Sequence, residues 1–135
     1  SLTRGYLLDT HIWLWLVADP SRLSLEVSDA LSDGDAELLL SPLSVWEIYT
    51  LVRRERIHLG MPVSTWIDLA FESLAVTELP LSTGVARRSG ELERPPTDPI
   101  DRFLVASASF HDLILVTSDL EILSVGGCRL LSNRG

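Results

Sequence analysis

Short apolar segments alternate with segments of helical periodicity along the whole chain, and this alternation constrains the fold more than any other feature. The apolar segments predict strands at Tyr6–Leu8, Glu37–Leu40, Val76–Leu79, Ile114–Thr117 and Arg129–Leu131, the last at an edge. Helices are predicted at Thr10–Val17, Ser24–Ser32, Pro42–Arg56, Val63–Ala75, Ser82–Leu92 and Pro99–His111. We therefore expect an α/β fold, a three-layer α/β/α sandwich with a central, mostly parallel sheet of about five strands.

The length and composition favour one domain spanning residues 1–135. A chain of 135 residues with 46% apolar residues buries roughly 68–70% of its unfolded surface. Cys128 is the only cysteine, which excludes an internal disulfide and a cysteine-based zinc site and favours a reducing, cytoplasmic location. The longest apolar stretch near the start, residues 6–17, contains Asp9 and His11, so we expect no membrane span; no signal peptide is visible.

The charge balance excludes several classes of protein. Nineteen acidic and 11 basic residues give a net charge of −8, which argues against holding nucleic acid by bulk charge. All the basic residues are arginine. Without lysine, the chain has no Schiff-base lysine, no P-loop lysine and no lysine of a phosphoaspartate receiver or a dehalogenase-like phosphatase.

Acidic residues follow the predicted strands at the points where function is expected. Asp9 ends the first strand, Asp119 follows the fourth, Glu47 lies in the helix after the second, and Asp98 and Asp101 open the last long helix. In open α/β sheets, ligands bind outside the carboxyl ends of the strands. The topology therefore predicts that these carboxylates share one edge of the sheet.

Helix capping is the alternative explanation for each of these acids. Ser44 and Glu47 fit a capping box, and Asp98 before Pro99 fits an N-cap that places Asp101 in the first turn. Asp9 and Asp119 fit N-caps in the same way, with Asp119 capping a turn over residues 120–123. Capping explains why an acid is tolerated, but not why acids follow the two most apolar strands.

A set of carboxylates without lysine suits a hard divalent cation. Mg²⁺ and Mn²⁺ prefer oxygen ligands, and two such ions can activate water and stabilise the leaving oxygen of a phosphodiester. A bound cation would also reverse the local sign of charge, which would let an acidic protein accept RNA.

Four motifs in order carry a family resemblance that covers nearly the whole chain. They are LLDTH at 7–11, SPLSVWEI at 41–48, DPIDRFLVA at 98–106 and LVTSD at 115–119. With these motifs the chain resembles the PIN-domain ribonucleases, specifically the VapC-like toxins of bacterial toxin–antitoxin pairs. The resemblance implies a PIN-like α/β/α sandwich, RNA as substrate, Mg²⁺ or Mn²⁺ as cofactor, a homodimer and a VapB-type antitoxin as partner. It places the metal-binding and catalytic carboxylates at Asp9, Glu47, Asp101 and Asp119, and Asp98 matches an extra acid of one subgroup.

Several further side chains are candidates for substrate contacts, each with a structural alternative. Arg53, Arg54 and Arg56 could meet RNA phosphates or an acidic partner, or could simply favour a helix C-terminus. Arg102 could contact phosphate or form an ion pair. Ser118 and Thr117 could hold metal-bound water or shape a turn.

The remaining polar and aromatic candidates are more often structural. His11 could be a base or an outer-sphere group, but a lone histidine at a helix start is usually structural. The four tryptophans favour core or interface roles over base stacking; they are Trp13, Trp15, Trp46 and Trp66. Cys128 is expected to be inert.

The sequence thus predicts a metal-dependent endoribonuclease that leaves 5′-phosphate and 3′-hydroxyl ends. A catalytically silent module that binds an antitoxin is the alternative of a different class, and a metal-dependent phosphomonoesterase is a third. The third lacks an Asp-x-Asp motif, since the first strand is followed by Asp9-Thr10-His11. The apolar residues 12–16 predict an exposed surface for dimerisation or the antitoxin.

Overall fold

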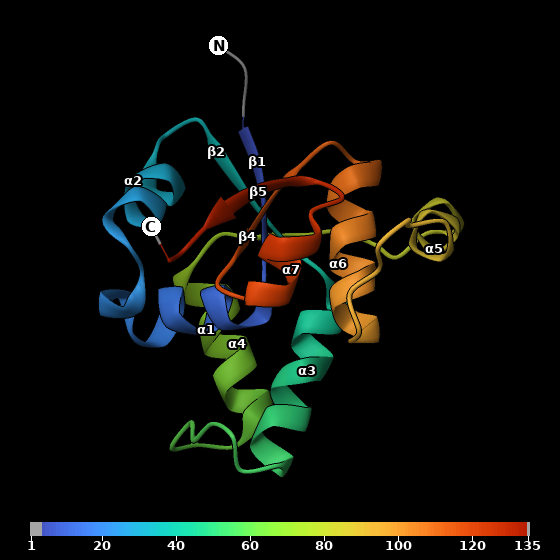
Figure 1. Cartoon of the computed structure of the whole chain (residues 1–135). Coiled ribbons are helices and arrows are strands. Elements are labelled where there is room, and N and C mark those ends of the chain that lie inside the picture. The colour runs from blue at the N-terminus through green and yellow to red at the C-terminus, as the bar shows by residue number, and fades with distance from the viewer. Residues whose placement is uncertain (1–3, 135) are drawn as a thin grey trace.

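The computed structural model describes residues 4–134, which form one parallel sheet with helices on both faces (Figure 1). The strands are β1 (Arg4–Leu8), β2 (Ala36–Leu40), β3 (Thr77–Glu78), β4 (Ile114–Thr117) and β5 (Arg129–Ser132). The helices are α1 (Thr10–Ala18), α2 (Leu25–Ser32), α3 (Pro42–Arg53), α4 (Val63–Ser73), α5 (Thr83–Gly90), α6 (Pro99–Phe110) and α7 (Leu120–Val125), with a 3₁₀ turn at Pro20–Arg22.

The sheet has the order β3-β2-β1-β4-β5, and every neighbouring pair is parallel. In the centre, Tyr6 of β1 lies opposite Leu38 of β2 and Ile114 of β4. The predicted mostly parallel sheet of about five strands in an α/β/α sandwich is confirmed.

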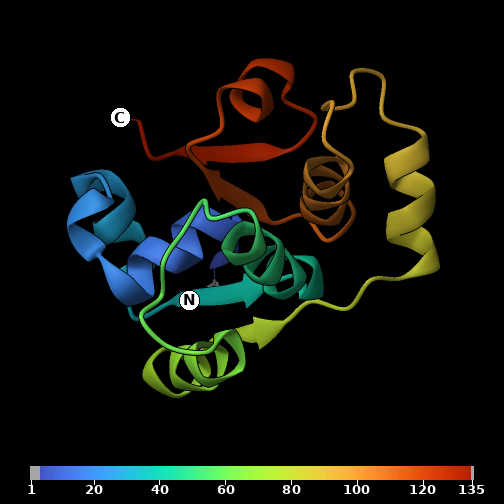
Figure 2. The same cartoon turned by 90° about the horizontal axis from the view of Figure 1, so that it is seen from below.

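Alternating side chains of the strands supply two cores, one on each face of the sheet. Tyr6 and Leu8 face the larger core with α1, α2, α3 and α4, whereas Leu7 faces the smaller core with α6 and α7. This follows from the two-residue period of a strand. Helix α5 lies outside α6 rather than on the sheet (Figure 2).

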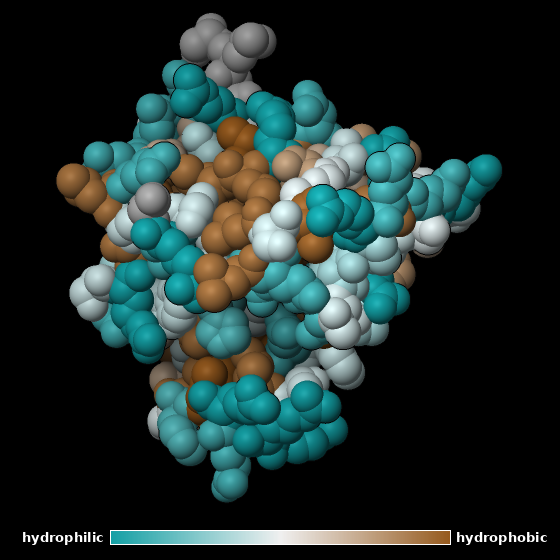
Figure 3. Space-filling model, viewed as in Figure 1, coloured by the Kyte–Doolittle hydropathy of each residue, from teal (hydrophilic) through white to brown (hydrophobic). Residues whose placement is uncertain are grey.

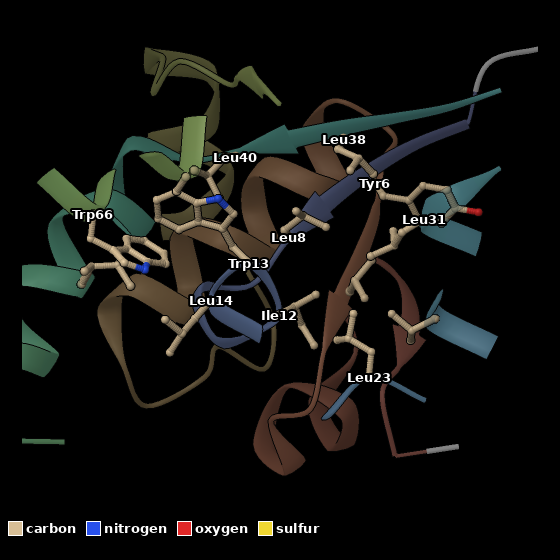
Figure 4. Packing of buried hydrophobic residues seen from close by; sticks show 14 residues of the cluster. Tyr6, Leu8, Ile12, Trp13, Leu14, Leu23, Leu31, Leu38, Leu40 and Trp66 are labelled. Carbon is tan, nitrogen blue, oxygen red and sulfur yellow. The ribbon is translucent and has the colours of Figure 1, made fainter. Parts of the chain in front are cut away.

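An aromatic cluster fills the centre of the larger core. Trp13 is fully buried and meets Trp66 edge-on at 5.2 Å between ring centroids, close to Leu40 (Figure 4). Among the described residues, its indole Nε1 is the one buried side-chain nitrogen or oxygen without a hydrogen-bond partner, so packing alone holds the ring. Such an aromatic pair contributes about 0.5–1.5 kcal/mol beyond the area it buries.

The predicted bounds lie within two residues of the observed ones, except at the end of α3. The helix predicted to reach Arg56 ends at Arg53, because Glu55 adopts a left-handed conformation with φ 56°. The Arg56 amide then donates to the Leu51 carbonyl at 2.8 Å and closes the turn. The turn expected after Asp119 is in fact the short helix α7.

Within residues 4–134, no helix has both the length and the apolar character that crossing a membrane requires.

The packing of β4 predicts a sharp difference between two leucines. Leu115 is fully buried, whereas Leu120 at the start of α7 is 63% exposed. We expect Leu115→Ala to lower the free energy of unfolding by about 2–5 kcal/mol through lost burial and a cavity. Leu120→Ala should stay within about 0.5 kcal/mol. Urea denaturation of both variants measures the difference; equal losses would contradict the assignment of Leu115 to the core.

Candidate active site

Five carboxylates line one open cleft of about 480 Å³ at the carboxyl edge of the sheet. They come from the β1–α1 junction, α3, the start of α6 and the β4–α7 junction: Asp9, Glu47, Asp98, Asp101 and Asp119. The cleft lies where β1 continues to a helix on one face and the adjacent β4 to a helix on the other. This is the switch point at which open parallel sheets bind ligands, so the predicted convergence is confirmed.

Asp9 is the most enclosed of the five. It is 8% exposed and caps α1, with its Oδ1 accepting from the Thr10 amide at 2.8 Å. Its Oδ2 accepts from the Thr117 hydroxyl at 2.6 Å. Burial raises the pKa of Asp9, while the hydrogen bonds from Thr117 and Thr10 oppose the rise.

Glu47 has no capping role. Ser41, not Ser44, is the N-cap of α3, because its hydroxyl accepts from the Leu43 amide at 3.1 Å. Ser44 is buried one turn inside, where its Oγ accepts from the Thr10 hydroxyl at 3.0 Å. The capping-box interpretation of Glu47 is therefore wrong. Burial raises the pKa of Glu47, with smaller contributions from the neighbouring carboxylates, and a hydrogen bond with Thr10 opposes the rise.

Asp98 and Asp101 open α6 in different roles. Asp98 is its N-cap, as predicted, and accepts from the Ile100 amide at 2.8 Å ahead of Pro99 at the first helical position. Asp101 lies in the first turn and lines the cleft. Burial, reinforced by repulsion from the other four carboxylates, raises the pKa of Asp101 to about 8.

Thr117 connects Asp9 to Asp119. Asp119 caps α7 by accepting from the Ile122 amide at 3.0 Å, and its own amide donates to Thr117 Oγ1 at 3.0 Å. Thr117 is fully buried. Unlike Ser118, it does not line the cleft, and its hydroxyl orients two of the carboxylates.

Only some of the candidate arginines line the cleft. Arg102 is outside the cleft lining; its Nε donates to the Pro96 carbonyl at 2.5 Å and its Nη2 to the Thr97 carbonyl at 2.9 Å. Among residues 4–134 it forms no ion pair, and its two hydrogen bonds fix the loop before α6. Arg53 also lies outside the lining, whereas Arg54, Arg56 and Ser118 belong to it. The structure therefore brings Arg54, Arg56 and Ser118, but not Arg53, together with the carboxylates.

Sequence reasoning missed the two residues that hold the Ser118 segment. Asn133 Oδ1 accepts from the Ser24 amide at 2.7 Å, and its Nδ2 donates to the Arg22 carbonyl at 3.0 Å and to Ser118 Oγ at 3.2 Å. Arg134 Nε donates to the Ser118 carbonyl at 2.6 Å. The one available signal was that Asn133 is the only asparagine in the chain.

Cys128 lies in an environment that favours the protonated thiol. Its thiol is half-buried, and burial raises its pKa to about 11, so it stays protonated at neutral pH.

The donor set of the cleft fits a hydrated hard cation. Its acids offer only carboxylate oxygens, the ligands of Mg²⁺ and Mn²⁺. Across residues 4–134, no three acidic, histidine or cysteine side chains already stand close enough to enclose an ion. Mg²⁺ does not need such a cage, because it is usually bound through one or two carboxylates and retains several waters.

Comparison with known proteins assigns this architecture to a family. The model of the PIN domain matches residues 6–127. The chain belongs to the PIN-domain family. The Ribonuclease VapC22 of Mycobacterium tuberculosis (strain ATCC 25618 / H37Rv) is 36% identical over 121 residues, which cover 87% of this PIN domain and 89% of that protein. The resemblance inferred from the four motifs is thereby confirmed.

Solved structures share the fold of this PIN domain. The VapBC2 complex of Rickettsia felis, bound to a promoter DNA fragment, contains a chain with TM-score 0.68 and 15% identity, covering 95% of this chain and 98% of that one. A chain of VapBC-1 from nontypeable Haemophilus influenzae has TM-score 0.67 and 18% identity, covering 97% and 99%. At these identities the likeness establishes the fold.

The raised pKa of Asp101 predicts how stability depends on pH without metal. The carboxyl of Asp101 has a pKa near 4 in the unfolded chain and about 8 in the folded protein. The free energy of unfolding therefore falls as the pH rises from about 4 to about 8, because the folded protein resists ionisation of this group. In EDTA, we therefore expect Asp101→Asn to be more stable than the parent at pH 7–8, by about 1–2 kcal/mol after allowance for solvent screening. Below pH 4 the two proteins should converge.

Thermal melts from pH 4 to 8 measure this difference. Asp68→Asn is the matched control, because it removes the same charge from an exposed position on α4 outside the cleft. A less stable Asp101→Asn protein at pH 7 would mean that the favourable dipole contact of a first-turn acid, worth ~0.3–1 kcal/mol, outweighs the repulsion.

Proposed function

We propose that this protein is a metal-dependent endoribonuclease, acting as the toxin of a VapBC-type toxin–antitoxin pair, with residues 1–135 forming a single PIN-like domain. The observation that carries the proposal is the convergence of five carboxylates in the cleft of a PIN domain. The 36% identity to a VapC ribonuclease along most of both chains supports RNA as the substrate.

The carboxylates of Asp9, Glu47, Asp101 and Asp119 would hold Mg²⁺ or Mn²⁺, and the exposed Asp98 stands at the rim of the same cleft. When bound, such a cation supplies charge neutralisation at a phosphodiester and lowers the pKa of coordinated water. This chemistry predicts 5′-phosphate and 3′-hydroxyl ends.

The surrounding side chains keep the carboxylates in place rather than react. Thr117 fixes Asp9 through a side-chain hydrogen bond and Asp119 through its amide. The loop before Asp98 is held by Arg102 and by Glu121, which accepts from the Thr97 amide at 2.9 Å and from its hydroxyl at 2.8 Å. Rigid carboxylates need no rearrangement when charge develops, which is the basis of electrostatic preorganisation.

Asp9→Asn tests the proposed metal dependence. Asparagine is an equally good N-cap, so the cap of α1 is kept while an anionic ligand is lost. We expect RNA cleavage in Mn²⁺ to fall roughly 10²-fold or more, and EDTA to abolish cleavage by the parent protein. Gel assays with total RNA and end-group analysis of the products provide the measurement, with Asp68→Asn as the charge-matched control.

Three outcomes would contradict this proposal. Full activity in EDTA would exclude metal dependence, and 2′,3′-cyclic phosphate ends would favour catalysis by the cleft residue His11 or by His58 or His111 instead. A folded parent protein that cleaves no RNA with added cation would favour the silent interaction module.

We also propose that the chain forms a homodimer and binds a VapB-type antitoxin. The expected apolar surface is not at residues 12–16, since Ile12, Trp13 and Leu14 are 0%, 0% and 7% exposed in the core. Large apolar side chains are instead exposed on α3 and α4: Trp46 at 57%, Tyr49 at 41%, Leu69 at 46% and Phe71 at 41%. Exposed apolar side chains of this size favour protein contacts.

Trp46→Glu tests whether this surface serves protein contacts. We expect the parent to have a dimeric mass by light scattering at tens of micromolar and to co-purify with the product of a small neighbouring gene. Trp46→Glu should weaken at least one of these associations at least tenfold, because it places a charge in an apolar interface. Leu120→Glu, at a 63% exposed position on α7, is the control. A monomeric parent that captures no such product would refute the partner proposal.

A further inference from the structure

The cleft is lined by aromatic and basic side chains as well as by acids. His11 and Trp15 of α1 line it, together with Arg54 and Arg56 from the end of α3. The His11 and Trp15 rings lie 5.7 Å apart between centroids, and the Arg22 guanidinium carbon lies 4.9 Å from the Trp15 ring centroid. These three planar groups form a row, in which the His11 and Trp15 rings are tilted by 52° and line the cleft, while Arg22 lies against Trp15 outside the lining.

Trp15 differs from the other three tryptophans. Trp13 and Trp66 are buried at 0% and 5% exposure, and Trp46 is exposed away from the cleft. Trp15 is half-buried against the larger core and is the one tryptophan in the cleft lining. Trp15 therefore packs against the core, as predicted, and in addition lines the cleft.

The two cleft arginines have no acidic partner. Among residues 4–134, the one ion pair joins Arg129 to Asp112, on the surface. Arg54 and Arg56 are exposed and line the same cleft as five carboxylates without pairing with any of them. Their charges are therefore available to an anionic ligand.

The turn after α3 accounts for the position of Arg56. Glu55 has φ 56°, a conformation that costs a residue other than glycine about 1 kcal/mol or more. It ends the helix, so that Arg56 as well as Arg54 lines the cleft while Arg53 stays outside. In Figure 3, hydrophilic side chains gather at the lowest end of the molecule, below a hydrophobic patch; Figure 1 shows the end of α3 and the loop that follows at this end.

We propose that the His11–Trp15–Arg22 row and the Arg54–Arg56 pair form a subsite for one unpaired nucleotide beside the scissile phosphodiester. The base stacks on the row, and the two arginines contact its phosphates. This inference rests on the proposed ribonuclease function and adds to it the residues that select unpaired RNA.

The chemistry of each group fits this role. Unpaired bases stack on aromatic rings and on guanidinium planes, and each stack is worth about 1–3 kcal/mol. Arg22 is exposed, so a base either stacks on its guanidinium or displaces it from Trp15. In an A-form duplex the base faces are already stacked on one another, so a duplex has no free base to stack on the His11–Trp15–Arg22 row.

Binding of RNA by an inactive protein tests the subsite directly. The probe is a fluorescein-labelled pool of random-sequence RNA 12-mers, single-stranded or annealed, with the Asp101→Asn protein in Mg²⁺. In this background we expect Trp15→Leu to weaken single-strand binding at least fivefold and leave duplex binding unchanged. Trp15→Phe should restore most of the affinity. Thermal melts verify that the variants are folded.

Exposed arginines give a second test that does not depend on core packing. Arg54→Gln and Arg56→Gln should each reduce the slope of log affinity against log salt concentration by about 0.7, the value for one phosphate contact on a single strand. Arg53→Gln, which removes the same charge from the same helix end outside the cleft, should leave the slope unchanged.

The results separate this inference from the proposed function. Suppose that the parent protein cleaves RNA with added cation, but that Trp15→Leu leaves the single-strand affinity of the Asp101→Asn protein unchanged. The subsite is then wrong and the ribonuclease function stands. Equal salt slopes for the Arg53, Arg54 and Arg56 variants, or no binding of the single-stranded pool by the Asp101→Asn protein, would also overturn the subsite. Absence of cleavage by the parent would refute the function itself.

Discussion

The hydrogen bond from Thr117 to Asp9 is the contact on which the geometry of the cleft depends. It joins the ends of β1 and β4 at 2.6 Å, where the chain leaves the sheet toward opposite faces. A buried carboxylate without partners would cost several kcal/mol. Because the same hydroxyl also accepts from the Asp119 amide, one buried side chain sets the positions of two acids from distant parts of the sequence.

Helix capping and the proposed metal binding are compatible, since a carboxylate has two oxygens. Asp9, Asp98 and Asp119 each use Oδ1 to cap a helix. The N-termini of α1, α6 and α7 therefore meet at the cleft, where their partial positive charges favour anions. Glu47 has no such role, and Asp101 lies in the first turn of α6 without capping it. Burial and repulsion therefore raise the pKa values of both.

Features set by local sequence were predictable, and features set by distant contacts were not. The short apolar strands and the acids placed after them are local patterns, so the sheet and the five carboxylates could be predicted. Asn133 forms hydrogen bonds with Ser24 and Ser118, which lie 109 and 15 residues away in the sequence. The residues around Asn133 show no pattern that predicts these contacts. The end of α3 was misjudged because glutamate at residue 55 gives no sign of a left-handed conformation.

Local charge, rather than net charge, decides whether an acidic chain can receive RNA. At physiological ionic strength, charges separated by more than about 8 Å are largely screened, so most of the net charge of −8 has little influence inside the cleft. The relevant groups are those that line it: five carboxylates toward the sheet, and Arg54 and Arg56 beyond the end of α3. A cation held by the carboxylates would make both sides of the cleft attractive to a phosphodiester backbone. The unpaired arginines would provide this attraction before any cation binds. The placement of positive and negative groups within the cleft therefore says more about RNA binding than the net charge of the chain does.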